Sequence, residues 1–307
     1  MQKQIPNGVY PTMLTPFTDG NKVDYPALEQ MINWYIDRGV AGLFAICQSS
    51  EIFFLSFEER LAVLKFVMEH VPKGFPVIAS GHTADDLETQ IEEAKAFIAT
   101  GIDAYVFISN RFAAKDEGDD VYLKNMFHVA NSLPEIPLGV YECPYPYKRL
   151  LSPAVIKEMA DDGRFQFLKD TCCDLGQIKE KLKAAEGSSF KIYNANCALL
   201  LDSLELGCAG FSGVMANFHP ELYAELCGIY KENPARARLL QNFVGFFSVA
   251  ECQVYPINAK YYMGLDGLGI KINTRSRNVA DFPRNRQVEI EQMRELTLLF
   301  KEYLKTV

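Results

Sequence analysis

The segment from residue 137 to residue 169, PLGVYECPYPYKRLLSPAVIKEMADDGRFQFLK, decides the fold. It opens with an apolar run over Pro137–Cys143 and closes with another over Phe165–Lys169, both short and of the composition that strands favour. Between them, Ser152-Pro153 supplies a helix cap and a first-turn proline, and Ala154–Asp161 continues with helical periodicity. The segment therefore predicts a strand, a helix and a second strand, the unit that joins parallel strands.

The same unit recurs along the first 214 residues. Six more apolar runs of this kind occur at Gly8–Leu14, Gly42–Cys47, Pro76–Ser80, Asp103–Ser109, Phe190–Asn194 and Cys208–Val214. Their spacing is close to the roughly 30 residues that one βα unit needs. Eight strands, each followed by a helix, predict a TIM (β/α)₈ barrel over residues 1–232. A doubly wound open sheet is the alternative, but the glycine-rich phosphate turn expected after its first strand is absent.

After the eighth run the sequence is mostly helical. We expect helices over Pro220–Lys231, Pro234–Cys252, Pro256–Met263 and Arg286–Lys305, with Gly264–Arg284 as a connection. The first of these can close the barrel. The others predict a C-terminal helical extension, residues 233–307, rather than a second independent core.

Composition limits the classes of function. The 307 residues include 31 Lys and Arg against 39 Asp and Glu, a net charge of −8, which argues against nucleic acid as the main partner. No apolar run approaches a membrane span, and the start of the chain is short and polar, so we expect no membrane and a cytoplasmic location. The eight cysteines form no CxxC pair, and the four histidines do not stand with carboxylates at metal-ligand spacing. We therefore expect reduced thiols and no metal.

Two residues at the ends of neighbouring predicted strands suggest the chemistry. Lys169 ends a strand that a barrel buries on both faces, so its pKa should fall toward that of a free amine, which can form a Schiff base with a ketone. Tyr141 ends the adjacent strand, about 5 Å away, and a phenol there can carry protons. The plainer alternatives are a lysine that reaches solvent and a tyrosine that packs.

The turn after the second strand could bind an anion. Gln48-Ser49-Ser50 has small side chains whose backbone N–H groups can converge on a 2-oxo acid carboxylate, although a plain turn remains the alternative. Phe211, in the eighth strand, is the remaining candidate substrate contact. Five cysteines also fall at strand ends, where they either fill apolar niches or present reactive thiols: Cys47, Cys143, Cys172, Cys173 and Cys197.

These residues resemble the dihydrodipicolinate synthase / N-acetylneuraminate lyase family of class I aldolases. The resemblance rests on Thr15-Pro16-Phe17, on Tyr141 with Pro144, on Lys169, and on Gly207-x-x-Gly210-x-Ser212. It implies that Lys169 forms the Schiff base without an external cofactor and that Tyr141 relays protons. It also implies a TIM barrel, a small 2-oxo acid substrate such as pyruvate, and a homo-oligomer, either a tetramer or a dimer.

The departures from the family pattern bear on the substrate. Gln48 replaces the hydroxyl that completes the proton relay in the synthases, and Phe112 ends the segment that aligns with their borrowed tyrosine. Pro146 stands where the synthases place an arginine, and Asn196-Cys197 replaces the acidic pair of the sialic acid lyases. We therefore expect a Schiff-base lyase, an aldolase or dehydratase, for a 2-oxo acid such as a 2-keto-3-deoxy sugar acid. True dihydrodipicolinate synthase or N-acetylneuraminate lyase activity, or a non-catalytic 2-oxo acid binding relative, are the alternatives.

Overall fold

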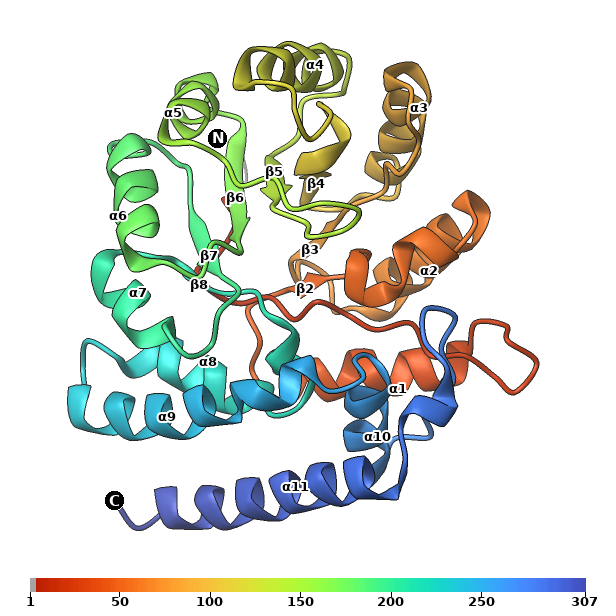
Figure 1. Cartoon of the computed structure of the whole chain (residues 1–307), viewed down its shortest axis with the longest axis vertical. Helices are drawn as coiled ribbons and strands as arrows, with labels where there is room; N and C mark the ends of the chain where they lie inside the picture. The colour runs from red at the N-terminus through yellow and green to blue at the C-terminus, as the bar shows by residue number, and fades with distance from the viewer. Residues whose placement is uncertain (1–3) are drawn as a thin grey trace.

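The computed structural model describes residues 4–307, and within them eight parallel strands form a barrel (Figure 1). The strands are β1 (Gly8–Val9), β2 (Leu43–Phe44), β3 (Val77–Ala79), β4 (Ala104–Ile108), β5 (Leu138–Tyr141), β6 (Phe165–Asp170), β7 (Ile192–Asn194) and β8 (Gly210–Phe211). They pair in the order β1-β8-β7-β6-β5-β4-β3-β2. The ring closes where the Met13 N–H donates to the Phe44 carbonyl at 3.0 Å. The predicted TIM barrel is confirmed.

The helices between the strands surround this ring (Figure 1). They are α1 (Tyr25–Ile36), α2 (Phe57–His70), α3 (Leu87–Ile98), α4 (Asp119–Asn131), α5 (Pro153–Asp162), α6 (Leu175–Ala184), α7 (Leu200–Leu206) and α8 (Pro220–Ile229). The caps form as the sequence predicts: Ser56 and Glu59 bond reciprocally at the start of α2, and Ser152 accepts from the Val155 N–H in α5. Gly207 ends α7 at φ 118°, a conformation that glycine adopts without strain.

Aromatic rings fill the barrel interior. Phe167 of β6 stacks on Tyr193 of β7 with ring centroids 4.4 Å apart, and it meets Tyr10 and Phe44 edge-on. The apolar runs continue beyond the hydrogen-bonded strands because side chains at the barrel ends are buried as well. The filled interior leaves the carboxyl ends of the strands as the place for a cavity.

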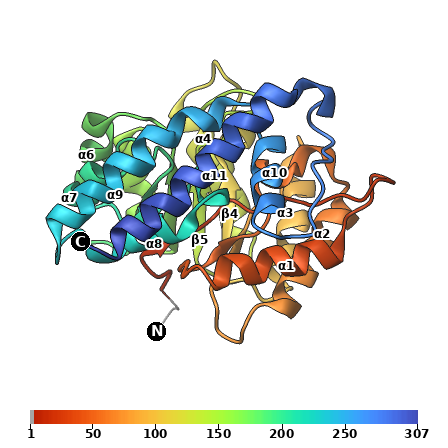
Figure 2. The ribbon, with the colours of Figure 1, turned by 90° about the horizontal axis from the view of Figure 1, so that it is seen from below.

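The chain after residue 232 packs against one side of the barrel. It contains α9 (Pro234–Phe246), α10 (Ile257–Leu265) and α11 (Arg284–Leu304), and α11 lies outermost, across the side formed by α1 and α8 (Figures 1 and 2). The prediction of one helix over Pro234–Cys252 is wrong, since α9 ends at Phe246 and a 3₁₀ turn follows over Phe247–Cys252.

The extension is joined to the barrel by polar contacts. Asp266, at the end of α10, accepts hydrogen bonds from Trp34 at 3.2 Å and from Arg38 at 3.0 Å.

The division of the chain into two domains, residues 1–232 and 233–307, stays a prediction. Among the described helices, none combines the length and apolar character needed to cross a bilayer.

Candidate active site

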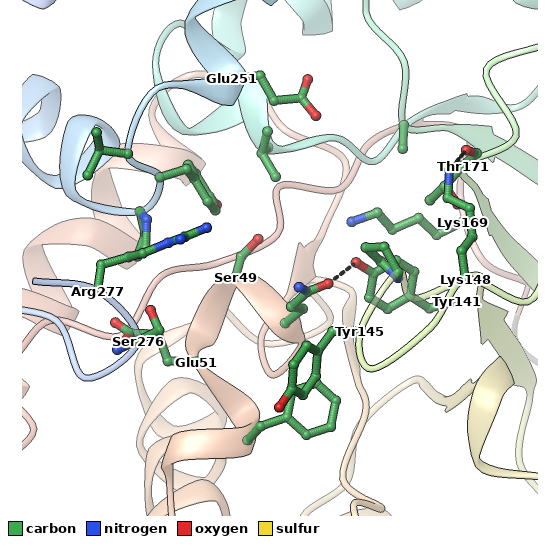
Figure 3. Close-up of a pocket in the computed structure, with 18 of the residues that line it drawn as sticks. Ser49, Glu51, Tyr141, Tyr145, Lys148, Lys169, Thr171, Glu251, Ser276 and Arg277 are labelled. Atoms are coloured by element: carbon green, nitrogen blue, oxygen red, sulfur yellow. Dashed lines mark hydrogen bonds between the residues drawn. The ribbon is translucent and has the colours of Figure 1, made fainter. Parts of the chain in front are cut away.

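A cavity of about 660 Å³ opens at the carboxyl ends of the strands (Figure 3). Loops after β2, β5, β6, β7 and β8 form part of its wall, and the C-terminal extension forms the rest. The lining residues used below are Gln48, Ser49, Glu51, Tyr141, Lys148, Lys169, Cys173, Asn196, Glu251, Tyr255, Ser276 and Arg277. The cavity is therefore built jointly by barrel loops and extension.

Lys169 and Tyr141 are paired across the β5–β6 ladder and both face the cavity (Figure 3). The Lys169 amino nitrogen lies 4.2 Å from the centroid of the Tyr141 ring. Lys169 is only 3% exposed, and burial lowers the pKa of its amine, against smaller opposing effects of Cys47, Cys143 and Glu251. An amine of lowered pKa is nucleophilic at a lower pH than an ordinary lysine, which is what Schiff-base formation needs.

A buried ion triad fixes the strand ends that carry these two residues. Lys181 of α6 contacts Glu142 at 2.6 Å and Asp170 at 2.5 Å, and these carboxylates directly follow Tyr141 and Lys169 in the chain. All three charged side chains are at most 1% exposed. The triad thus ties β5 and β6 to one helix and holds the lysine and the phenol in register.

Gln48 contacts the phenol directly. The Tyr141 hydroxyl donates to the Gln48 side-chain carbonyl at 3.1 Å, and the Cys143 thiol donates to the same oxygen at 3.4 Å. Burial raises the pKa of Tyr141 well above its usual value, so the phenol stays protonated. A role of Gln48 in binding substrate oxygen stays a prediction.

Ser49 belongs to a chain of hydroxyl groups along the cavity floor. Its hydroxyl donates to Thr12 at 3.0 Å, and the nearby Tyr255 also lines the cavity. Asn217 donates to the Tyr255 oxygen at 3.0 Å. The structure therefore brings Ser49, but not the neighbouring serine, to the cavity.

Ser50 and Phe211, expected to contact substrate, do not line the cavity. The Ser50 hydroxyl is fully buried and lies 2.8 Å from the carbonyl oxygen of Met13 and 3.0 Å from that of Ala45, so it braces the loop. The Phe211 ring stacks on Tyr223 at 4.3 Å, between β8 and α8. Phe211 does end β8, and Ser50 lies in a 3₁₀ turn after β2, but both side chains point into the wall.

The lining residues that sequence reasoning missed include Glu251, Tyr255 and Arg277 of the extension. The sequence pattern predicts a single helix through Cys252 and assigns Glu251 no role. Instead the 3₁₀ turn brings its carboxylate to the cavity wall near Lys169 (Figure 3). Burial raises the pKa of Glu251, while the Lys169 charge lowers it. Two polar residues, Glu251 and Gln253, interrupt the apolar sequence shortly before Pro256, and this was the available signal that the helix ends earlier.

Most of the strand-end cysteines are buried. Burial raises the pKa of Cys143 to about 11 and that of Cys197 to about 12. Cys172, where burial is again the main cause, also rises to about 12. Of the five, Cys173 alone lines the cavity and is exposed, and Cys47 is buried. For Cys143, Cys172 and Cys197 the pKa is raised rather than lowered, which favours the apolar-niche interpretation, and sensitivity of the activity to thiol modification stays a prediction.

The described residues offer no cluster of three or more His, Cys, Asp or Glu side chains suited to a metal ion. His82 is fully buried, accepts from the Ile108 N–H at 2.7 Å and contacts Gln90 at 2.9 Å. Burial lowers its pKa to about 3, so it is a neutral core residue.

Comparison with known proteins agrees with this geometry. Residues 5–276 match the model of the dihydrodipicolinate synthetase family. The chain is 27% identical over 272 residues to a protein of Acetivibrio thermocellus named 4-hydroxy-tetrahydrodipicolinate synthase, covering 88% of this chain and 90% of the relative. A protein of Clostridium novyi with the same name is 24% identical over 260 residues, covering 84% and 86%.

Solved structures share the fold. YagE of E. coli K12, a prophage protein of the dihydrodipicolinic acid synthase family in complex with pyruvate, superposes with a TM-score of 0.86 at 22% identity, covering 96% of this chain and 98% of that one. CdNal of Clostridium difficile, in complex with mannosamine, gives 0.84 at 18% identity, covering 94% and 98%. The chain belongs to the dihydrodipicolinate synthetase family of class I aldolase-type lyases.

Proposed function

We propose that this enzyme is a Schiff-base-forming lyase that acts on a 2-keto-3-deoxy sugar acid. The observation that carries the proposal is the Lys169 amine beside the Tyr141 phenol at the base of a cavity much larger than a three-carbon acid needs. The reactive group is the lysine itself, so the reaction requires no external cofactor.

The chemistry follows from the two side chains. The Lys169 amine attacks the C2 ketone, and loss of water from the carbinolamine gives the imine. In a retro-aldol reaction the C3–C4 bond then breaks, its electron pair enters the imine to give an enamine, and the C4 hydroxyl loses its proton. Protonation at C3 and hydrolysis release pyruvate and restore the amine. Tyr141 lies where a phenol can transfer the protons of these steps.

A dehydratase is the second candidate, because one observation favours it. Glu251 has a raised pKa, and in the described part of the chain it makes no hydrogen bond or ion pair. A protonated carboxyl group can donate its proton to a departing hydroxide, which leaves as water. In that reaction loss of a C3 proton to a base gives the enamine, whose electron pair expels the C4 hydroxyl.

The contacts of Gln48 argue for a substrate other than those of the two best-known family activities. An amide carbonyl accepts the phenol proton in a hydrogen bond but cannot pass it on as a hydroxyl does. Asn196, with Glu251, provides polar atoms for hydroxyl groups of a longer substrate.

We further propose that the enzyme is cytoplasmic and that it forms a homo-oligomer, either a tetramer or a dimer. Light scattering on the purified protein tests the oligomeric state.

Reductive trapping tests the proposal. Incubation with pyruvate and borohydride should add one reduced adduct to the wild-type protein, and peptide mapping should locate it at Lys169. Lys169→Ala should give none. Lys191→Ala is the matched control, because burial also lowers the pKa of Lys191 but its amine bonds to the Ile5 carbonyl at 2.6 Å, away from the cavity. An adduct in Lys169→Ala, or none in wild type, contradicts the mechanism.

A panel of 2-oxo acids then separates the two reactions. Release of pyruvate with an aldehyde identifies the aldolase, whereas a dehydrated product without pyruvate identifies the dehydratase. Adduct formation without turnover of any member would favour a non-catalytic binding relative.

A further inference from the structure

Arg277 lies on the cavity wall contributed by the extension, and its guanidinium points into the cavity (Figure 3). Its side chain is exposed, and within residues 4–307 it has neither a hydrogen-bond partner nor an ion-pair partner. In the view of Figure 3 it faces Lys169 from the opposite side, with the cavity between them. The cavity therefore has a basic side chain at each end: the Lys169 amine, which is proposed to attack the ketone, and Arg277, which has no assigned role.

The segment that carries Arg277 is held in place by one buried carboxylate. An oxygen of Glu51 accepts from the Thr274 hydroxyl at 2.6 Å, from the Arg275 N–H at 2.7 Å and from the Ser276 N–H at 2.8 Å. Its other oxygen is paired with Lys260 at 3.0 Å, and both of these side chains are at most 1% exposed. Arg277 thus extends from a fixed backbone, which reduces the entropy lost when it binds a ligand.

Two other cations lie near this cavity, and both already make contacts. Arg275 forms two 2.8 Å hydrogen bonds with the Glu59 carboxylate. Lys148, on the β5 loop, donates to the Thr171 carbonyl at 2.6 Å. Arg277 is the member of this set that makes no hydrogen bond or ion pair within the described residues, whereas Lys148 keeps its charge and two further N–H donors on the β5 side of the cavity.

We propose that Arg277 binds a second carboxylate at the far end of the substrate, so that the preferred substrate is a dicarboxylic 2-keto-3-deoxy sugar acid. This inference rests on the proposed function. A guanidinium presents two parallel N–H donors that match the two oxygens of a carboxylate. A terminal phosphate carries more charge and ordinarily collects more than one cation or several backbone N–H groups, and here the adjacent Arg275 is held by Glu59.

Glu251 offers Arg277 a competing role. The two side chains line the same cavity, and an arginine that merely neutralised this carboxylate would serve every substrate equally. The proposal instead requires that the effect of Arg277 depend on the charge at the far end of the substrate. That difference is the basis of the test.

The experiment compares two substrates of equal chain length that differ at C6. These are 2-keto-3-deoxygluconate, which ends in a hydroxymethyl group, and 2-keto-3-deoxyglucarate, which ends in a carboxylate. Wild type should show at least a tenfold higher kcat/KM for the dicarboxylate. In Arg277→Ala that value should fall about 10- to 100-fold, as expected for loss of a charged hydrogen bond, and the value for the monocarboxylate should change less than threefold. Arg277→Lys should be intermediate.

Arg238→Ala is the control, because Arg238 is a partly exposed arginine on α9 that pairs with Asp202 outside the cavity. It should leave both values unchanged. Equal losses on both substrates in Arg277→Ala, or no preference in wild type, would overturn the inference. A 6-phosphate of the first substrate that is preferred over the dicarboxylate would also overturn it, in favour of phosphate.

Reductive trapping with pyruvate distinguishes this failure from failure of the proposed function. Pyruvate has no second anionic group, so trapping should be the same in Arg277→Ala and in wild type. Normal trapping without discrimination between the substrates removes the role of Arg277 alone. Absence of trapping in wild type removes the Schiff-base mechanism itself.

Discussion

Replacing Tyr141 with phenylalanine removes one oxygen atom from the centre of the cavity. The ring should stay in place, because Phe44 packs edge-on against it at 6.1 Å and the residue is 5% exposed. The Lys169 amine also keeps its position 4.2 Å from the ring centroid. What is lost is the 3.1 Å hydrogen bond to Gln48 and the group proposed to transfer protons.

The two losses differ in size. A neutral buried hydrogen bond contributes about 0.5–1.5 kcal/mol to the free energy of unfolding. A general acid/base contributes about 10²–10⁴-fold in rate, which corresponds to about 2.7–5.4 kcal/mol of activation free energy. Tyr141→Phe should therefore remain folded at room temperature while losing nearly all turnover.

Tyr193→Phe is the matched control. Tyr193 is a buried barrel tyrosine whose hydroxyl donates to the Pro6 carbonyl at 2.7 Å, away from the cavity. Both variants should lose similar stability in urea unfolding, but Tyr193→Phe should keep turnover within a few-fold of wild type. A loss of turnover below tenfold in Tyr141→Phe, or equal losses in the two variants, would refute the assignment of the phenol.

Three further predictions follow from the same site. The rate of adduct formation should rise with pH as the Lys169 ammonium loses its proton. Because the Glu251 charge raises the pKa of Lys169, Glu251→Gln should move this rise to lower pH in a stopped-flow pH profile. A profile that stays in place or moves to higher pH contradicts the coupling. Gln48→Thr should weaken binding of the best substrate found in the panel by about 1–3 kcal/mol, measured as a higher Kd in a slow-turnover background; unchanged binding would make Gln48 a purely structural residue. Lys181→Met should lower the free energy of unfolding, measured by urea denaturation, by about 3–5 kcal/mol, because it leaves two buried carboxylates without their cation. A change below about 1 kcal/mol contradicts that account.

The barrel could be predicted from the sequence because each βα repeat carries its own signals. Apolar runs, the Ser56 and Ser152 caps and the helix-ending glycine at 207 all act within a few residues of where they stand. Lys169 and Tyr141 could be predicted for the same reason, since strand ends in a parallel barrel face one side.

The other half of the cavity could not be predicted in this way. Whether a serine at a strand end faces substrate or the wall depends on which carbonyl oxygens lie near it, and Ser50 is held by two that come from other parts of the loop region. Glu251 reaches the cavity through a 3₁₀ turn, and Arg277 follows the segment 274–276 that the Glu51 carboxylate holds in place. The positions of both segments depend on long-range contacts. Local periodicity contains no information about such contacts.

The Glu51 carboxylate has a consequence for how this protein can change over evolutionary time. It fixes the backbone at 274–276 through hydrogen bonds that use only one side-chain hydroxyl and two backbone N–H groups. The side chain at position 277 therefore makes no contact that holds the loop in place. Lys169 and Tyr141, by contrast, lie on buried strands where few substitutions are compatible with the packing. Substitutions at 277 can alter which molecules the enzyme accepts while the reaction on Lys169 persists, so new specificities can arise by single steps that pass through folded, chemically competent intermediates.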